Sequence, residues 1–401
     1  MLSFFKIRNQ DHKSFIILAT ILFAVVVFAG SWNCDDAYHG FVTIRNFANG
    51  HGLVYNIGER VNACTCPLFI IILGCFYFLF GHLTILSYIV CTIYSSVAFY
   101  ILINKICKEK WQIAFSLVIL GTSYCFMSFT TSGLENSLLF LLEVIFIVFY
   151  TKEDRYSFQD LLVLAFIDSL ILFTRMDAGI LFFIPTAYVY LFRRKECSIF
   201  KMVLAGLIGL FPWGGVWEVF SVFYYGSFVP NTYYVKLGTS YPVMEYIAHG
   251  LKYLFISLGY DIPLVLFIFI AVILLFQTKN IRYMMFGVGL ILKLFWIIYM
   301  GGDFMVGRHF TDLFWVSICW LMVISGEKDE CIWKTISLRK AVSVVGAACI
   351  LLTIQTKQFV YDTFMWPVDG VSCGDEKGYY ASTFGMMSRA YQYKTWILGF
   401  T

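Results

Sequence analysis

The sequence predicts an all-α polytopic membrane protein. Of its 401 residues, 60% are hydrophobic and only 13% are charged, whereas about a quarter of a soluble domain is charged. Apolar runs recur along the whole chain, and many approach the roughly 20 residues that a helix needs to cross a bilayer. Short clusters of Lys and Arg separate these runs, as in the loops between membrane spans. This composition excludes a set of soluble domains, whose surfaces it could not cover with polar groups.

The apolar runs follow one another with short connections. They are residues 15–31, 67–80, 83–104, 111–130, 134–150, 158–174, 178–192, 200–220, 261–277, 283–300, 309–325 and 341–355. Three basic residues precede the first run, and the residues after it do not form a small-residue cleavage site. We therefore expect the first run to remain as a span rather than to be removed as a signal peptide.

The segment 67–80 decides the topology. If it crosses the membrane, the basic clusters at 105–110, 193–195 and 328–340 lie outside. If it instead lies in the interface or re-enters, all three clusters lie in the cytoplasm. The segment is also short for a span. The positive-inside rule therefore favours about 11 transmembrane helices with a cytoplasmic N-terminus.

Under this topology the unusual chemistry lies on the outer side. A transmembrane domain over 1–355 carries a first outer loop (32–82) with interfacial helices and a second outer loop (221–260). A short extracytoplasmic tail (356–401) follows. The small net charge of +4 and the scattered basic residues give no indication of nucleic-acid binding. The cysteines form no C-x-x-C pair, and the redox state of Cys64 and Cys66 stays open.

Two adjacent carboxylates, Asp35 and Asp36, follow the first span directly. One can serve as a general base, and its neighbour can raise its pKa by like-charge repulsion or orient a substrate. An Asp after an apolar span can equally cap an interfacial helix over residues 37–48. These residues alone leave both interpretations open.

The outer side also carries a few basic side chains. Arg175, Lys236 and Arg308 stand at membrane boundaries, where a cation can hold a phosphate or simply extend to the headgroups. No dedicated ligand set for a metal is apparent, so a divalent cation is compatible with the chemistry but not required. Glu143, Asp168 and Lys293 lie inside predicted spans, which is the starting point for a transporter hypothesis.

Several motifs resemble a bacterial branch of the GT-C glycosyltransferase superfamily that includes mycobacterial terminal β-(1→2)-arabinofuranosyltransferases. The first is D-D-A-Y at 35–38, continued by G-H-G-L-V-Y-N at 50–56 and G-E-R-V at 58–61. The others are S-G-L-E at 132–135, T-R-M-D at 174–177, P-N-T-Y-Y-V-K at 230–236, G-G-D-F-M at 301–305 with Arg308, and D-E-K-G-Y-Y at 375–380. They occur in order over nearly the whole chain.

The resemblance implies a GT-C-like helical bundle in the bacterial cytoplasmic membrane, with its active site on the outer face. The implied reaction moves a sugar, an arabinofuranose-like pentose or a hexose, from a polyprenyl-phosphate donor to an envelope glycan or lipid-linked saccharide, with inversion. Asp35 or Asp36 is the implied base. The implied donor-binding residues are Arg45, His51, Arg175, Lys236, Asp303 and Arg308. The residues implied to shape the site are Glu59, Arg60, Glu135, Asp177, Asn231 and Tyr233.

Two other functions stay open. A transporter or flippase of lipid-linked saccharide would pair Asp168 with Lys293 across a midplane cavity. A non-catalytic envelope assembly protein would keep the fold without activity. The chain departs from the family pattern at His39, Val42, 62–66 and Val306, which leaves the sugar open.

Overall fold

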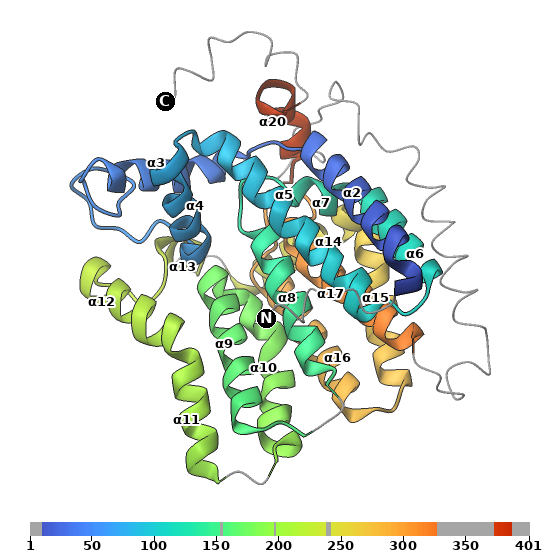
Figure 1. Ribbon diagram of the computed structural model, residues 1–401. Helices are drawn as coiled ribbons and strands as arrows, with labels where there is room; N and C mark the ends of the chain where they lie inside the picture. The colour runs from blue at the N-terminus through green and yellow to red at the C-terminus, as the bar shows by residue number, and fades with distance from the viewer. Residues whose placement is uncertain (1–9, 153–154, 196–197, 238–241, 327–372, 387–401) are drawn as a thin grey trace.

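The computed structural model is all-α, and it describes residues 10–152, 155–195, 198–237, 242–326 and 373–386. Figure 1 shows the helices packed side by side into one bundle. The first half contains α2 (Lys13–Ala29), α3 (Asp35–Ala48), α4 (Pro67–Phe80), α5 (Leu83–Ile101), α6 (Lys110–Thr122), α7 (Tyr124–Phe129), α8 (Asn136–Tyr150), α9 (Phe158–Thr174) and α10 (Gly179–Tyr188). The second half contains α11 (Ile199–Leu210), α12 (Val219–Tyr225), α13 (Asn231–Leu237), α14 (Val243–Tyr260), α15 (Ile262–Gln277), α16 (Ile281–Tyr299), α17 (Thr311–Ser325) and α20 (Glu376–Phe384).

Short 3-10 and π-helical segments extend or join these helices. They are η1 (Gln10–His12), η2 (Leu102–Ile106), η3 (Met176–Ala178), η4 (Val189–Arg193), η5 (Phe211–Glu218) and η6 (Arg308–Phe310). Two isolated bridges, Tyr156 to Arg194 and Met305 to Gly374, are the β-type pairings recorded within the described ranges.

Three continuous helices are long and apolar enough to cross a membrane. They are Leu83–Ile106, Ile199–Tyr225 and Ile281–Tyr299. The pair α14 and α15 passes the same test together, but it is bent by 111° and is either a broken span or a re-entrant loop. The shorter helices α2, α4 and α8 are also apolar. Three to four candidate spans are therefore present in the described part of the chain, and the predicted number of about 11 stays a prediction.

Helix boundaries follow the predicted apolar runs closely. The short segment 67–80 forms α4, with Pro67 in its first turn, as suits a residue that lacks an N–H donor. The run 158–174 forms α9. The run 111–130 instead breaks into α6 and α7 at Ser123, whose hydroxyl donates to Asp261 at 2.8 Å. The run 341–355 lies outside the described residues.

The segment predicted as the second outer loop, 221–260, is mostly helical, and its place outside the membrane stays a prediction. It contains the end of α12, then α13 and the 18-residue helix α14. Helix α14 is amphipathic and buries Gly250, Tyr253 and Leu254 against the bundle. Hydropathy along the sequence missed it because Glu245, His249 and Lys252 interrupt the apolar residues on its other face.

The bundle is built around α17, in which nearly every residue is buried. Helices α8 and α15 pack against it. By contrast, α11 and α12 project from one side (Figure 1) and expose large apolar side chains, such as Phe200 (74% exposed) and Phe223 (86% exposed). An exposed apolar surface of this extent is consistent with membrane association.

Candidate functional site

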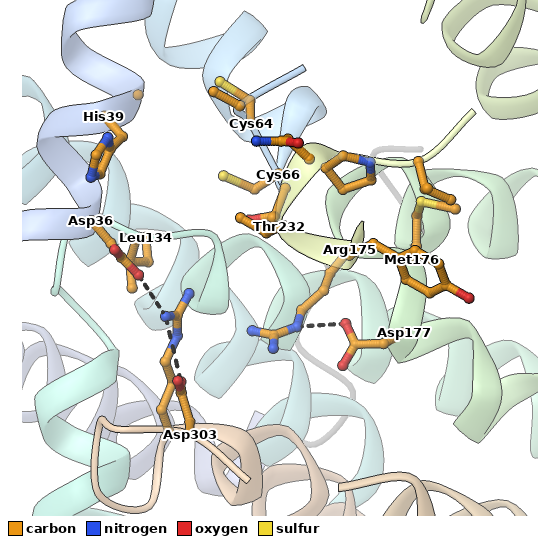
Figure 2. Close-up of a pocket in the computed structure, with 18 of the residues that line it drawn as sticks. Asp36, His39, Cys64, Cys66, Leu134, Arg175, Met176, Asp177, Thr232 and Asp303 are labelled. Atoms are coloured by element: carbon orange, nitrogen blue, oxygen red, sulfur yellow. Dashed lines mark hydrogen bonds and ion pairs between the residues drawn. The ribbon is translucent and has the colours of Figure 1, made fainter. Parts of the chain in front are cut away.

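One cavity of about 790 Å³ lies where segments far apart in the sequence meet. Its walls come from the start of α3, the loop before α4, the turn before α8, the turn after α9, the start of α13, and the turn between α16 and α17. Figure 2 shows polar and sulfur-containing side chains from these segments pointing into the same space. Its polar lining includes Asp36, His39, Glu59, Cys64, Cys66, Arg175, Asp177, Asn231, Tyr233, Asp303, Arg308 and His309.

Asp36 lies at the wall of this cavity and contacts Arg308. The Arg308 guanidinium donates to Asp36 Oδ2 at 3.1 Å. The same guanidinium lies 3.6 Å from Glu135 and 3.7 Å from Asp303. Arg308 is only 8% exposed, so its charge is compensated by carboxylates rather than by water. These contacts hold the Asp36 side chain at the first turn of α3, with part of its carboxylate facing the cavity.

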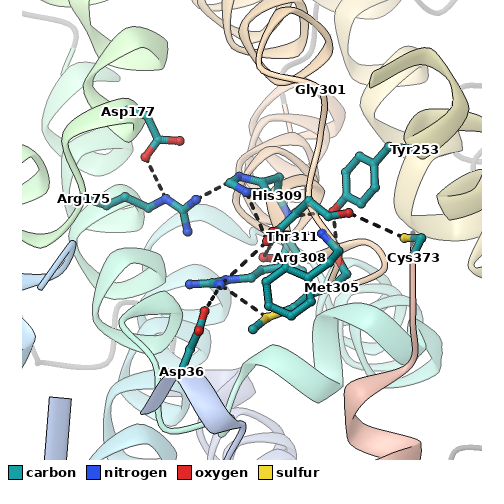
Figure 3. A network of polar contacts seen from close by, with 12 residues as sticks. Asp36, Arg175, Asp177, Tyr253, Gly301, Met305, Arg308, His309, Thr311 and Cys373 are labelled. Carbon is teal, nitrogen blue, oxygen red and sulfur yellow. Dashed lines mark hydrogen bonds and ion pairs between the residues drawn. The ribbon is translucent and has the colours of Figure 1, made fainter. Parts of the chain in front are cut away.

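Arg175 forms the second half of the same network (Figure 3). It donates to Glu135 at 2.9 Å and to Asp177 at 2.8 Å. Lys293 also contacts Asp177 and lies 3.9 Å from Asp312. Glu135 therefore bridges the two arginines. Its burial favours the neutral acid, but Arg308 and then Arg175 outweigh burial and lower the pKa of Glu135.

His309 completes the network, and the sequence analysis missed it. Its Nδ1 lies 2.8 Å from the Arg175 guanidinium, and its Nε2 lies 3.2 Å from Asp303. The only signal in the sequence is its position next to Arg308. Lys293 was considered only for a transporter, yet it contacts Asp177, which lines the cavity.

The first turn of α3 is held by the turn before α8. The Cys34 N–H donates to the Ser132 carbonyl at 3.0 Å. Gly133 has φ +79°, and a Cβ there would lie 2.4 Å from Asn33 Oδ1 and 2.8 Å from Ala37 Cβ. Only glycine allows this backbone conformation and this close approach. The approach brings Glu135 next to Arg308, the cation that contacts Asp36.

Both carboxylates of the Asp pair lie in the first turn of α3, and the N-cap position is Cys34. The alternative that an Asp caps a helix over 37–48 is therefore wrong, because the helix begins two residues earlier, at Asp35. Negative charge in the first turn is still favourable at the positive end of the helix dipole.

Asp35 points away from the cavity toward the tail. Its Oδ2 accepts a hydrogen bond from the Tyr380 hydroxyl at 3.2 Å. The neighbouring Asp375 accepts from Tyr124 at 2.7 Å and from Tyr260 at 2.6 Å, which fastens α20 to the bundle. Burial, with Asp35 and Asp36 nearby, raises the pKa of Glu376 to about 8. The D-E-K-G-Y-Y element thus contacts Asp35 on the side away from the cavity, and Asp35 itself stays exposed.

The other predicted site residues lie partly in the cavity and partly outside it. Glu59, Asn231 and Tyr233 line the cavity. Arg45 and His51 are exposed and do not line it. Arg60 stacks over the Tyr224 ring, 4.9 Å from its centroid. Lys236 is part of α13, but its side chain lies outside the described residues.

No family model, no curated protein and no solved structure matches this chain. The fold and the site therefore define its class on their own. It is an all-α protein with apolar helices long enough to cross a membrane, and its cavity is walled by carboxylates and buried arginines.

Proposed function

We propose that this protein is an inverting membrane glycosyltransferase of the GT-C type. It moves a sugar from a polyprenyl-phosphate donor to a hydroxyl of an envelope glycan or lipid-linked saccharide. The observation that carries the proposal is the convergence of five motifs on one cavity. The D-D-A-Y, S-G-L-E, T-R-M-D, P-N-T-Y-Y and G-G-D-F-M segments each contribute lining residues, although Asp36 and Asp303 are 267 positions apart.

The chemistry needs a base and a stabilised phosphate leaving group. Asp36 lines the cavity and accepts the proton of the acceptor hydroxyl, whose oxygen attacks the anomeric carbon. The bond from that carbon to the phosphate oxygen breaks, and the carrier phosphate leaves with the electron pair. Arg308 and Arg175 both line the cavity, where a guanidinium stabilises the developing phosphate charge. Asp35 faces the tail, so Asp36 is the base and Asp35 supports it.

The proposed membrane orientation places the cavity on the outer face of the bacterial cytoplasmic membrane. It rests on the charge bias of the loops and on about 11 predicted spans. In this orientation α3, α4 and α13 lie at the outer surface, and apolar residues such as Trp296 and Met300 line the part of the cavity that receives the lipid end of the donor.

Two observations disfavour the alternatives. A transporter would pair Asp168 with Lys293, but Asp168 accepts a hydrogen bond from Thr186 at 2.6 Å and Lys293 contacts Asp177. A non-catalytic assembly protein has no need of a cavity of this volume beside a carboxylate held by a buried arginine.

The direct test is a donor panel. The purified protein in lipid nanodiscs is incubated with polyprenyl-phosphate pentoses and hexoses and a crude envelope lipid acceptor, and release of polyprenyl phosphate is measured. We expect release from one donor and a product with inverted anomeric configuration. Protein-dependent movement of an intact donor between leaflets, without release from any donor, would contradict the proposal and favour a flippase.

A further inference from the structure

A second group of side chains lies beside the cavity, on the tail side of α3. Atoms of Cys34, Asp35 and Glu376 that can bind a metal lie within 4.8 Å of one another. Cys34 is the N-cap residue of α3, Asp35 is in its first turn, and Glu376 comes from the first turn of α20. Because these segments are about 340 residues apart, neither local sequence nor a helix terminus alone accounts for the cluster.

The hydrogen-bonding capacity of the Glu376 carboxyl group is not filled by the described residues. Its side chain is only 4% exposed, and its Oε2 has no hydrogen-bond partner among the described residues. A buried carboxylate oxygen without a partner is costly. Asp35 and Asp36 lie near Glu376, and the cation near it is the Arg308 guanidinium, which also faces Asp36, Glu135 and Asp303. Carboxyl groups thus outnumber cations around the cluster, and one buried carboxyl oxygen has no hydrogen-bond partner among the described residues.

Cys34 offers sulfur to the same space. Its side chain is fully buried, and its sulfur is one of the three ligand atoms of the cluster. Asp35 is exposed, so a cation can reach the cluster from the solvent side.

We propose that Cys34, Asp35 and Glu376 form a binding site for a divalent transition-metal ion, with Zn²⁺ the best match. One thiolate and two carboxylates suit this borderline-soft cation, and a water molecule supplies the fourth ligand. Zn–S distances of about 2.3 Å and Zn–O distances of about 2.0–2.2 Å require the three side chains to close slightly around the ion. Tyr380, which donates to Asp35, orients that carboxylate.

An ion at this site joins α20 to the start of α3. Asp35 is adjacent to Asp36, so the ion fixes the turn that carries Asp36 without itself lining the cavity. The site is independent of the proposed glycosyl transfer, because its ligands, apart from Asp35, have no place in that reaction.

The test measures metal-ion binding to the protein in the absence of a sugar donor. The full-length protein, stripped with a chelator, is titrated with Co²⁺, and thiolate-to-cobalt charge-transfer absorption is recorded, followed by displacement with Zn²⁺. We expect one saturable ion per chain and at least a tenfold loss of affinity in Glu376→Gln and Asp35→Asn. The charge-transfer band should disappear in Cys34→Ser and persist in Cys75→Ser, which changes an exposed cysteine away from the cluster.

The choice of variants distinguishes the absence of a metal site from misfolding of the protein. Asp35 is exposed, so Asp35→Asn is expected to fold even if the two buried positions tolerate no change. An absent charge-transfer band in the folded wild-type protein would overturn the site. Binding that is unaffected by Asp35→Asn and Glu376→Gln would overturn it as well. Neither outcome bears on release of polyprenyl phosphate, which is measured separately.

Discussion

At the scale of single residues, the site depends on a few buried charges that compensate one another. Glu135 is 1% exposed and lies between Arg175 and Arg308. Removing one member of a buried charged group leaves its partners uncompensated, which costs about 3–5 kcal/mol. The network therefore stabilises the fold around the cavity as well as positioning Asp36.

Glu135→Gln is expected to destabilise the protein by about 3 kcal/mol at neutral pH. The pKa of Glu135 is lowered in the folded state from its ordinary value of 4.5. Its ion pairs therefore contribute fully above that pH, and the contribution is lost as the pH falls through the folded-state pKa. Thermal unfolding of variant and wild type from pH 7 to pH 4 measures this difference.

The control is Glu245→Gln, which removes an exposed carboxylate from the first turn of α14. It should change the unfolding temperature little at any pH. A Glu135→Gln protein as stable as this control at pH 7 would mean that the two arginines do not depend on Glu135.

How far the sequence predicted the site also becomes clear residue by residue. Asp36, Arg175 and Arg308 were selected from their motifs, and the structure brings them to one cavity. His309 and the tail-facing direction of Asp35 were not predicted. Both depend on contacts between distant segments, Arg175 to His309 and Asp35 to Tyr380, and no local pattern encodes such contacts.

At the scale of elements, the turn before α8 sets the position of α3. Helices α4 and α9 were predicted with their observed bounds because uninterrupted apolar runs mark them. Helix α14 was missed because only one of its faces is apolar. The contact of α3 with Gly133 was also beyond prediction, since a glycine in a turn does not reveal what lies against it.

Gly133→Ala is expected to destabilise the protein by about 2–4 kcal/mol and to reduce transfer, because the new methyl group meets Asn33 and Ala37 in a strained backbone conformation. Gly58→Ala is the matched control: it has φ +90° but nothing within 4 Å of a Cβ. The control should be destabilised by backbone strain alone, about 1–2 kcal/mol. Equal unfolding temperatures for the two variants would contradict tight packing at Gly133.

At the scale of the whole molecule, the open question is orientation in the membrane. Length and composition identify three to four candidate spans in the described residues, while charge bias predicts about 11. The two numbers differ because several helices of the bundle, such as α2 and α8, are shorter than a full span. Whether they cross depends on their tilt and on local bilayer thickness, which hydropathy does not report.

Single cysteines at Glu245 and at Lys110, in a background without other reactive thiols, test the predicted topology. A membrane-impermeant maleimide should label Glu245→Cys in right-side-out vesicles and Lys110→Cys only in inverted vesicles. Both positions are exposed, so accessibility within the fold does not bias the comparison. The reverse pattern, with Lys110→Cys labelled in right-side-out vesicles and Glu245→Cys only in inverted vesicles, would contradict an interfacial α4.

The central claim is that Asp36 is the base in glycosyl transfer. The measurement that tests it most directly is the rate of polyprenyl-phosphate release by wild type, Asp36→Asn and Glu245→Gln under identical conditions with a donor that the wild type accepts. We predict a loss of about 10²–10⁴-fold for Asp36→Asn, an unfolding temperature close to that of the wild type, and an unchanged rate for Glu245→Gln. A folded Asp36→Asn protein that retains most of the wild-type rate would contradict the claim.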